Sequence, residues 1–238
     1  MDLRGALSRR IRRLRHRGDA VQCTCCGRSW GSFAPAWNRA NAICPGCGSH
    51  ERHRALCLYL AERTPLGDEP MSLLHFAPEH ALRGRMEAVP GLRYVTADLD
   101  PEGVDVQLDI TAMPFEDGAF DAILCSHVLE HVADDRAAMS ELHRVLKPGG
   151  WATVLVPLDL SREITYEDFG VTAPEDRVRE FGQHDHVRMY APDIVQRLEG
   201  VGFDVVTDRF VEKLGEDRCR RHGLLAEDLI FRCTRPSS

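Results

Sequence analysis

The sequence lacks any apolar run of the roughly 18 residues or more that a membrane-spanning helix needs. Its N-terminus is rich in arginine, but no apolar signal-peptide core follows. Internal repeats and low-complexity tracts are missing too. These absences argue against a membrane, secreted or repeat protein. With 238 residues, 43% of them hydrophobic and 28% charged, we expect a cytoplasmic protein with one α/β core and a short appendage.

Charge is unevenly distributed along the chain. Residues 1–17 contain seven arginines and one acid, whereas the whole chain carries a net charge of −7. A basic arm on an acidic body can contact RNA or another polyanion. Aliphatic residues also recur there at helical spacing, so residues 2–17 equally predict a helix that docks on its own acidic domain. Both interpretations stay open.

Nine cysteines are present, and five of them cluster within residues 23–47. Two C-x-x-C-G motifs lie in this cluster, with 17 residues between Cys26 of the first and Cys44 of the second. Four thiolates at such spacing suit tetrahedral Zn²⁺, and each glycine lets the backbone turn tightly behind the second ligand. The predicted ligands are Cys23, Cys26, Cys44 and Cys47. Four sulfur ligands leave no open coordination position, so the predicted metal is structural.

Cys25 lies inside the first motif and is the predicted spare cysteine. A ligand set that includes Cys25 instead would lack the matching glycine. The predicted element resembles the rubredoxin-like zinc ribbons that precede various enzyme domains.

A polar stretch, residues 49–54, follows the second motif. Ser49 is expected to cap a helix over residues 51–63, with Glu51 in the first turn favoured by the helix dipole. Arg52, His53 and Arg54 either belong to that helix only or present cationic side chains to an anionic substrate; this alternative stays open.

From Met71 onward, short apolar runs alternate with amphipathic segments, which is typical of βα units around a parallel sheet. The runs that predict strands are residues 71–76, 93–97, 120–125, 151–157, 203–207 and 229–233. The segments that predict helices are residues 79–88, 134–146 and 191–201. Proline and glycine at residues 147–150 are expected to end the second helix and turn the chain into a strand.

Residues 112–157 contain the runs Phe-Asp-Ala-Ile-Leu-Cys-Ser-His-Val-Leu-Glu-His-Val and Leu-His-Arg-Val-Leu-Lys-Pro-Gly-Gly. They closely resemble the middle of class I S-adenosylmethionine-dependent methyltransferases of the ubiquinone/menaquinone-biosynthesis kind. The similarity extends over about residues 71–157. It implies a Rossmann-like α/β fold whose seven-stranded sheet has a reversed C-terminal hairpin, with S-adenosylmethionine as cofactor.

The resemblance also implies a set of cofactor-binding residues. Asp98, at the end of the second core strand, matches the carboxylate that accepts hydrogen bonds from the ribose hydroxyls. Asp109 matches the acid that receives the adenine amino group, with Ile110 beside the ring, whereas Asp121 matches a structural position. The full predicted set is His75, Phe76, Ala77, Pro78, Glu79, Asp98, Leu99, Asp109, Ile110, Ser126 and His127.

The first core strand departs from the family pattern. A glycine-rich loop normally follows it, but here the chain reads Ala77-Pro78-Glu79, with no glycine before Gly84. Either Glu79 replaces an acid that binds the α-amino group of the cofactor, or the cofactor site has decayed and the domain is a scaffold. The intact segment from Ser126 to His131 favours a working site.

Residues 158–190 are too long for a plain connection and are predicted to form a lid over the substrate. Histidine titrates near neutrality, so His127, His184 and His186 are the predicted candidates for a general base. A metal is the weaker alternative for His184 and His186, because a His-x-His motif alone is a weak signal, whereas a purely structural role that ties the lid to the sheet fits equally well. The predicted domains are residues 1–64, with the zinc ribbon, and residues 71–238, with the methyltransferase.

The predicted function is methyl transfer to an O, N or C nucleophile. A small-molecule acceptor is favoured because the body is acidic, with a pI of about 5.9. The alternatives are an RNA base methyltransferase, which uses the arginine-rich arm, and a non-catalytic module that binds a partner.

Overall fold

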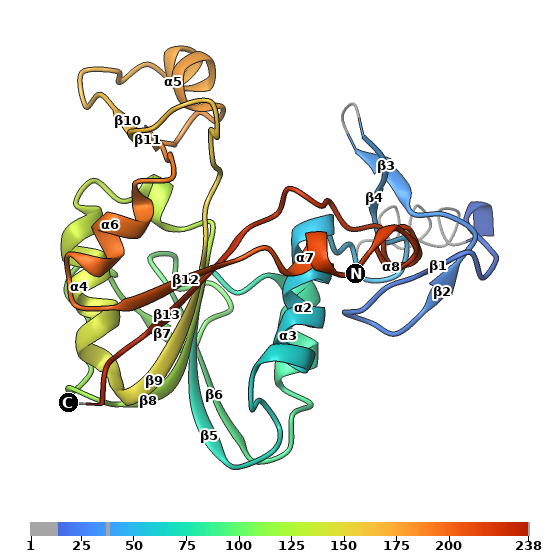
Figure 1. Ribbon diagram of the computed structural model, residues 1–238, viewed down its shortest axis with the longest axis horizontal. Coiled ribbons are helices and arrows are strands. Elements are labelled where there is room, and N and C mark those ends of the chain that lie inside the picture. The colour runs from blue at the N-terminus through green and yellow to red at the C-terminus, as the bar shows by residue number, and fades with distance from the viewer. Residues whose placement is uncertain (1–13, 37–38, 238) are drawn as a thin grey trace. The chain divides into compact units, whose positions relative to one another are not determined.

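The computed structural model describes residues 14–36 and 39–237. Two compact units emerge from its contacts (Figure 1). The first comprises Met1–Pro70, Glu79–Leu92 and Arg209–Leu229, and the second Met71–Pro78, Arg93–Asp208 and Ile230–Ser238. Segments from beyond residue 71 therefore contribute to the first unit, and the predicted domain boundaries stay a prediction. Most of the predicted helix over residues 2–17 lies outside the described residues.

A mixed sheet forms the core of the second unit. In the described residues it contains seven strands in the order β12-β13-β9-β8-β5-β6-β7 (Figure 1). Their bounds are β5 (Met71–Phe76), β6 (Leu92–Asp98), β7 (Val106–Gln107), β8 (Phe120–Ser126), β9 (Leu146–Leu155), β12 (Asp204–Asp208) and β13 (Ile230–Thr234). β8 pairs in parallel with β5 and β9, β6 pairs in parallel with β7, and β13 runs antiparallel to β9 and β12. The predicted seven-stranded sheet with a reversed C-terminal hairpin is confirmed.

The central strands read as continuous apolar runs because both of their faces are buried. Every residue of β5 is buried, and six of the seven residues of β8 are. The helices α4 (Asp135–Val145) and α6 (Ile194–Glu199) pack on this sheet (Figure 1). The side chain of Asp134 caps α4 by accepting a hydrogen bond from Ala137 N at 2.9 Å. These strands and helices position the carboxyl ends of β5 to β8, where the predicted site lies.

Residues 158–190 form an insertion with secondary structure of its own. It contains β10 (Tyr166–Glu167), α5 (Pro174–Phe181) and β11 (Arg188–Met189), and β10 pairs antiparallel with β11. The ends of the insertion meet, because Leu158 bridges to Tyr190. Val187 N donates to the carbonyl of Glu130 at 2.9 Å, which ties the base of the insertion to the short helix η1 (Leu129–His131) after β8.

The first unit contains two small hairpins and several helices. Its hairpins are β1 (Val21–Gln22) with β2 (Ser29–Trp30) and β3 (Ala34–Ala36) with β4 (Arg39–Ile43). Its helices include α2 (Glu51–Arg63), α3 (His80–Met86), α7 (Phe210–Lys213) and α8 (Glu216–His222). The bounds of α2 match the predicted helix, and its Tyr59 packs edge-on against Phe210 with ring centroids 5.3 Å apart. No helix among the described residues combines the length and apolarity needed to cross a membrane.

One local prediction, the cap of α2, was wrong, and one strand begins earlier than predicted. His50, not Ser49, occupies the N-cap of α2, because the Ser49 hydroxyl lies 3.2 Å from Cys23 Sγ and its carbonyl accepts hydrogen bonds from Cys44 N and Arg54. The breakers at residues 147–150 lie inside β9, where the pairing with β8 shifts register. Gly149 has a φ of +78° there, which glycine adopts without strain, so the chain passes from α4 to β9 without a separate loop.

Candidate functional site

Four cysteines of the first unit converge as the sequence predicts. Cys23, Cys26, Cys44 and Cys47 place their sulfur atoms within 4.8 Å of one another. Cys23 Sγ lies 3.6 Å from Cys47 Sγ, and Cys26 Sγ lies 3.8 Å from Cys44 Sγ. A tetrahedral zinc ion with Zn–S bonds of about 2.3 Å separates its sulfur ligands by about 3.8 Å. The geometry of the cluster therefore fits the ion.

Both motifs fold into the same turn. Gly27 N donates to the Cys23 carbonyl at 2.8 Å, and Gly48 N donates to the Cys44 carbonyl at 3.0 Å. The φ angles of Gly27 and Gly48 are +71° and +77°, in the left-handed region where a side chain is strained. This repeated turn explains why each C-x-x-C motif is followed by glycine.

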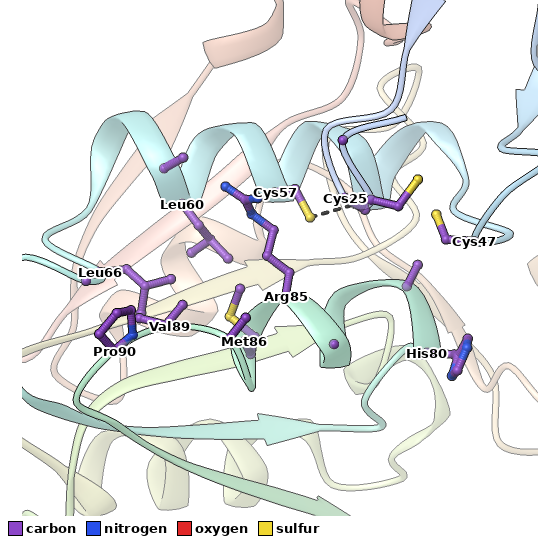
Figure 2. A pocket seen from close by; sticks show the side chains of 17 residues that line it. Cys25, Cys47, Cys57, Leu60, Leu66, His80, Arg85, Met86, Val89 and Pro90 are labelled. Atoms are coloured by element: carbon purple, nitrogen blue, oxygen red, sulfur yellow. Dashed lines mark hydrogen bonds between the residues drawn. The ribbon is translucent and has the colours of Figure 1, made fainter. Parts of the chain in front are cut away.

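Cys25 is not one of the four cysteines whose sulfur atoms could hold a metal ion together. Its Sγ accepts a hydrogen bond from Cys57 Sγ at 3.1 Å, and both side chains are buried (Figure 2). The predicted role of Cys25 as the spare cysteine fits this contact.

Arg54 is fully buried, so the structure excludes it as a surface residue for an anionic substrate. Its guanidinium donates to the carbonyls of Ala42, Ser49, His222 and Gly223 at 2.7–2.9 Å. Five guanidinium donors suit such a set of acceptors, and they join the second hairpin and α2 to the end of α8. Arg54 is therefore a structural residue.

A cavity of about 700 Å³ lies beside this cluster, between α2 and α3 (Figure 2). One end is apolar, with Leu60, Leu66, Met86 and Val89 (Figure 2). Of the predicted site residues, only the cysteines Cys26 and Cys47 contribute to its lining. The chemistry predicted from the sequence is therefore concentrated elsewhere, at the sheet of the second unit.

At that sheet, predicted residues follow directly after parallel strands. Asp98 ends β6, Ser126 ends β8, and Asp109 comes two residues after β7. Ala77 follows β5 and donates its N–H to the carbonyl of Ala97 at 2.9 Å. The carboxyl edge of an open α/β sheet is where such folds bind ligands.

The two residues that follow β5 and β8 have unusual backbone conformations. Ala77 has a φ of +45° and His127 a φ of +54°, and β5 and β8 are neighbouring parallel strands. A left-handed conformation costs a residue with a Cβ roughly 1–2 kcal/mol. Such strain concentrates at functional sites, where the surrounding structure imposes it. Ala77 thus adopts a glycine-like conformation where the methyltransferase family normally has glycine.

Replacing Ala77 with glycine is expected to stabilise the protein by about 1 kcal/mol, because glycine adopts a positive φ without steric cost. Equilibrium urea unfolding measures the change. The matched control is Ala97→Gly in the extended strand β6, which is expected to destabilise because it removes a buried methyl group and loosens the unfolded chain. A loss of stability in Ala77→Gly similar to that of the control would contradict the strain.

The two predicted acidic residues differ in their local contacts. Asp98 Oδ1 accepts a hydrogen bond from Asp100 N at 3.1 Å, which leaves Oδ2 for a ligand. Asp109 is exposed, and Oδ1 accepts from the Thr111 backbone N–H at 2.8 Å and its hydroxyl at 2.7 Å. These bonds hold the pKa of Asp109 below its usual range, so it is ionised at neutral pH. Leu99 is 70% exposed, whereas Ile110 is buried.

Other members of the predicted cofactor set have their side chains in the protein interior or against protein partners. His75 is fully buried, and its Nδ1 lies 2.8 Å from the hydroxyl of Tyr94. Phe76 belongs to the main apolar core. Glu79 Oε1 lies 3.6 Å from His53 Nε2 within the first unit. Their roles in cofactor binding stay predictions, as do those of Pro78 and Ser126.

Two of the three predicted catalytic histidines lie around one buried carboxylate. His127 Nδ1 lies 3.1 Å from Glu130 Oε1, and Glu130 is 1% exposed. His186 is buried in the same cluster as Glu130 and His131, and burial lowers the pKa of its imidazole. His184 has an exposed side chain 3.8 Å from Asp185. The structure thus brings His127 and His186 together and leaves His184 on the surface.

Arg188 is a buried charged residue that sequence reasoning did not single out. It is 1% exposed and donates to the carbonyls of Leu129, Val132 and Ala133 and to the Glu167 carboxylate. It therefore fastens the insertion to the segment that carries Glu130. No local signal identifies it, because its carbonyl partners lie 55 to 59 residues away in the chain.

Comparison with known proteins identifies the same region. Residues 81–154 match the family model described as methyltransferase domain. The chain is similar to the demethylmenaquinone methyltransferase of Thermus thermophilus, with 33% identity over 135 residues, 52% of this chain and 61% of that protein. It is also similar to the 2-phytyl-1,4-naphtoquinone methyltransferase of Nostoc punctiforme, with 31% identity over 140 residues, 54% of this chain and 53% of that protein. The chain thus spans little more than half of these relatives.

Solved structures share the fold. An S-adenosylmethionine-dependent methyltransferase from Mesorhizobium loti matches with a TM-score of 0.54 and 15% identity, over 76% of this chain and 98% of that one. A Haloferax volcanii complex of the Trm112 methyltransferase activator with a putative methyltransferase matches with a TM-score of 0.53 and 17% identity, over 78% and 91% of the two chains. The chain is thus similar to methyltransferases over residues 81–154 and in its curated relatives, and it shares the fold of S-adenosylmethionine-dependent methyltransferases of known structure.

Proposed function

We propose that this chain transfers a methyl group from S-adenosylmethionine to an O, N or C nucleophile of a small molecule. The observation that carries the proposal is the carboxyl edge of the sheet. Acidic residues end β6 and follow β7, and glycine-like backbone conformations follow β5 and β8. The relatives named above are methyltransferases of quinones by name, which favours a small-molecule acceptor over RNA.

S-adenosylmethionine supplies an electrophilic methyl group on a sulfonium centre, and the residues of this chain bind and orient it. In our proposal, Asp98 accepts hydrogen bonds from the ribose hydroxyls and Asp109 accepts one from the adenine amino group. Leu99 and Ile110 lie beside the adenine ring in this proposal. The left-handed Ala77 lets the backbone approach the methionine part, which favours a working cofactor site over a decayed one.

His127 is the proposed general base. Its Nδ1 lies 3.1 Å from the buried Glu130 carboxylate, and this contact orients the imidazole. The left-handed backbone of His127 sets the position of its Cβ, from which the imidazole extends. The insertion at residues 158–190 is the proposed lid over the acceptor. Alignment of nucleophile, methyl group and sulfur supplies the rest of the rate enhancement.

A zinc ion held by Cys23, Cys26, Cys44 and Cys47 is the second part of the proposal. The sulfur spacing and the repeated glycine turn support it. Since all four positions are thiolates, the ion stabilises the ribbon and takes no part in methyl transfer.

Replacing Asp98 with alanine is expected to weaken the binding of S-adenosylhomocysteine by roughly 10- to 100-fold. Hydrogen bonds to a charged group contribute about 1.5–3 kcal/mol, and each factor of ten corresponds to about 1.4 kcal/mol. Isothermal titration calorimetry measures the dissociation constants. Asp100→Ala is the matched control, because Asp100 is exposed, two residues away, and touches Asp98 only through its backbone N–H.

Two results would contradict the proposal. Folded wild-type protein that binds no S-adenosylhomocysteine at roughly several hundred micromolar would indicate a non-catalytic partner-binding module. An acceptor affinity that falls steeply with rising salt would indicate RNA, because neutralised phosphates release counterions. The affinity for a small uncharged acceptor should not fall steeply with salt.

A further inference from the structure

A second group of potential metal ligands lies in the second unit. Glu130 and His131 come from η1 after β8, and His186 comes from the insertion just before β11. Each offers one ligand atom, and these atoms all lie within 4.8 Å of one another. The rings of His131 and His186 are nearly perpendicular, with centroids 4.7 Å apart. Two imidazoles beside one carboxylate form a donor set that suits first-row transition metals.

The two oxygen atoms of the Glu130 carboxylate have different surroundings. Glu130 Oε1 faces His127 Nδ1 at 3.1 Å. Glu130 Oε2 is buried and has no hydrogen-bond partner among the described residues. Burial of an unpaired carboxylate oxygen costs desolvation free energy. A cationic or protonated partner at Oε2 would offset this cost.

Both imidazoles are oriented as metal ligands usually are. His186 Nδ1 lies 3.1 Å from the carbonyl of Phe181, and His131 Nδ1 lies 3.3 Å from Asp185 Oδ2. Metal-binding histidines commonly donate the N–H of the other ring nitrogen to a carbonyl or carboxylate, which fixes the tautomer and leaves Nε2 as the ligand. The same arrangement occurs here twice, once for each ring.

We propose that Glu130, His131 and His186 bind a divalent transition-metal ion through one carboxylate oxygen and two imidazole nitrogens. The ion connects η1 to the base of the insertion. Three protein ligands leave coordination positions open, in contrast to the four thiolates of the ribbon. His131 is about one-third exposed on its side chain, which provides a route for the ion and for an oxygen atom of the acceptor. The ion thereby connects the insertion at residues 158–190 to Glu130, the carboxylate that orients His127 in the proposed function, on which this consequence rests.

The test is titration of the full-length, zinc-loaded protein with Co²⁺, followed by calorimetry and visible absorption. We expect one Co²⁺ bound per chain beyond the ribbon. It should show d–d bands of nitrogen and oxygen ligation without a sulfur-to-cobalt charge-transfer band. His131→Gln and Glu130→Gln should each weaken this binding at least about 100-fold. Loss of a residue that only hydrogen-bonds to a metal ligand costs less, about 10- to 100-fold. His131 is partly exposed, so its variant tests the site without disturbing a buried position.

His184→Gln is the matched control, because His184 is exposed on the same loop and two residues from His186. It should bind Co²⁺ as the wild type does. Circular dichroism verifies that each variant is folded. If one of the ligand variants His131→Gln and Glu130→Gln does not fold, the other carries the test. No uptake by wild-type protein at millimolar Co²⁺, uptake that the ligand variants share, or a thiolate charge-transfer band on the added ion would each overturn the proposal.

Discussion

Replacing Cys44 with serine is expected to remove the zinc ion and unfold the ribbon. The loss of a thiolate opens the tetrahedral site, and structural zinc contributes roughly 10–16 kcal/mol of apparent binding free energy in small zinc elements. That exceeds what the short hairpins β1–β2 and β3–β4 can supply by burial, since two-stranded hairpins are marginal alone. Zinc released by a thiol-modifying mercurial should fall from one ion per chain to none. Amide exchange over residues 21–50 should become fast.

The matched control is Cys25→Ser in the same motif. Cys25 contacts Cys57 and lies outside the four-sulfur cluster, so this variant should keep its zinc. Equal loss of zinc from Cys25→Ser and Cys44→Ser would show that the ligand set is wrong. Full zinc content in Cys44→Ser would show that the cluster does not bind the ion.

Replacing Arg188 with methionine is expected to cost about 3–5 kcal/mol of stability. The substitution leaves one buried and two partly buried carbonyl oxygens, and part of the Glu167 carboxylate, without donors. Removal of one partner from a buried charged network has this magnitude. Methionine retains much of the volume, so the loss reports the polar contacts more than a cavity. Urea unfolding measures it. Because Arg188 fastens the insertion to η1, KM for the acceptor should also rise.

Arg162→Met is the comparison for that experiment. Arg162 lies in the same insertion, but its ion pair with Asp159 is exposed, and exposed pairs contribute about 0–1 kcal/mol. A cost for Arg188→Met that is no greater than for Arg162→Met would contradict the structural role of Arg188. A large cost with an unchanged KM would separate stability from the positioning of the lid.

Much of this molecule follows from local patterns in the sequence. The runs at residues 71–76 and 120–125 predict buried strands, because strands covered on both faces need apolar side chains throughout. The two C-x-x-C-G motifs predict one cluster of thiolates, because each motif forms its turn locally and glycine alone adopts that turn without strain. The resemblance to methyltransferases and the topology of the sheet could therefore be predicted before any coordinates.

Boundaries and caps were less predictable. Ser49 looks like an N-cap because serine favours that position, but the tertiary contact with Cys23 and Arg54 occupies its polar groups. Proline and glycine at residues 147–150 predict a strand that begins only at residue 151, but an irregularity in the pairing with β8 accommodates these residues within β9. Local propensity is a weak signal wherever long-range partners compete for the same groups.

The sequence by itself determined the cysteine cluster, the order of strands and helices, and the acidic residues that end β6 and follow β7. Only the tertiary structure decided which polar groups share a buried environment. It made Arg54 and Arg188 structural residues, left His184 on the surface, and grouped Glu130, His131 and His186. The physical reason is that desolvation depends on neighbours dozens of residues away in the chain, and sequence periodicity carries no record of those neighbours.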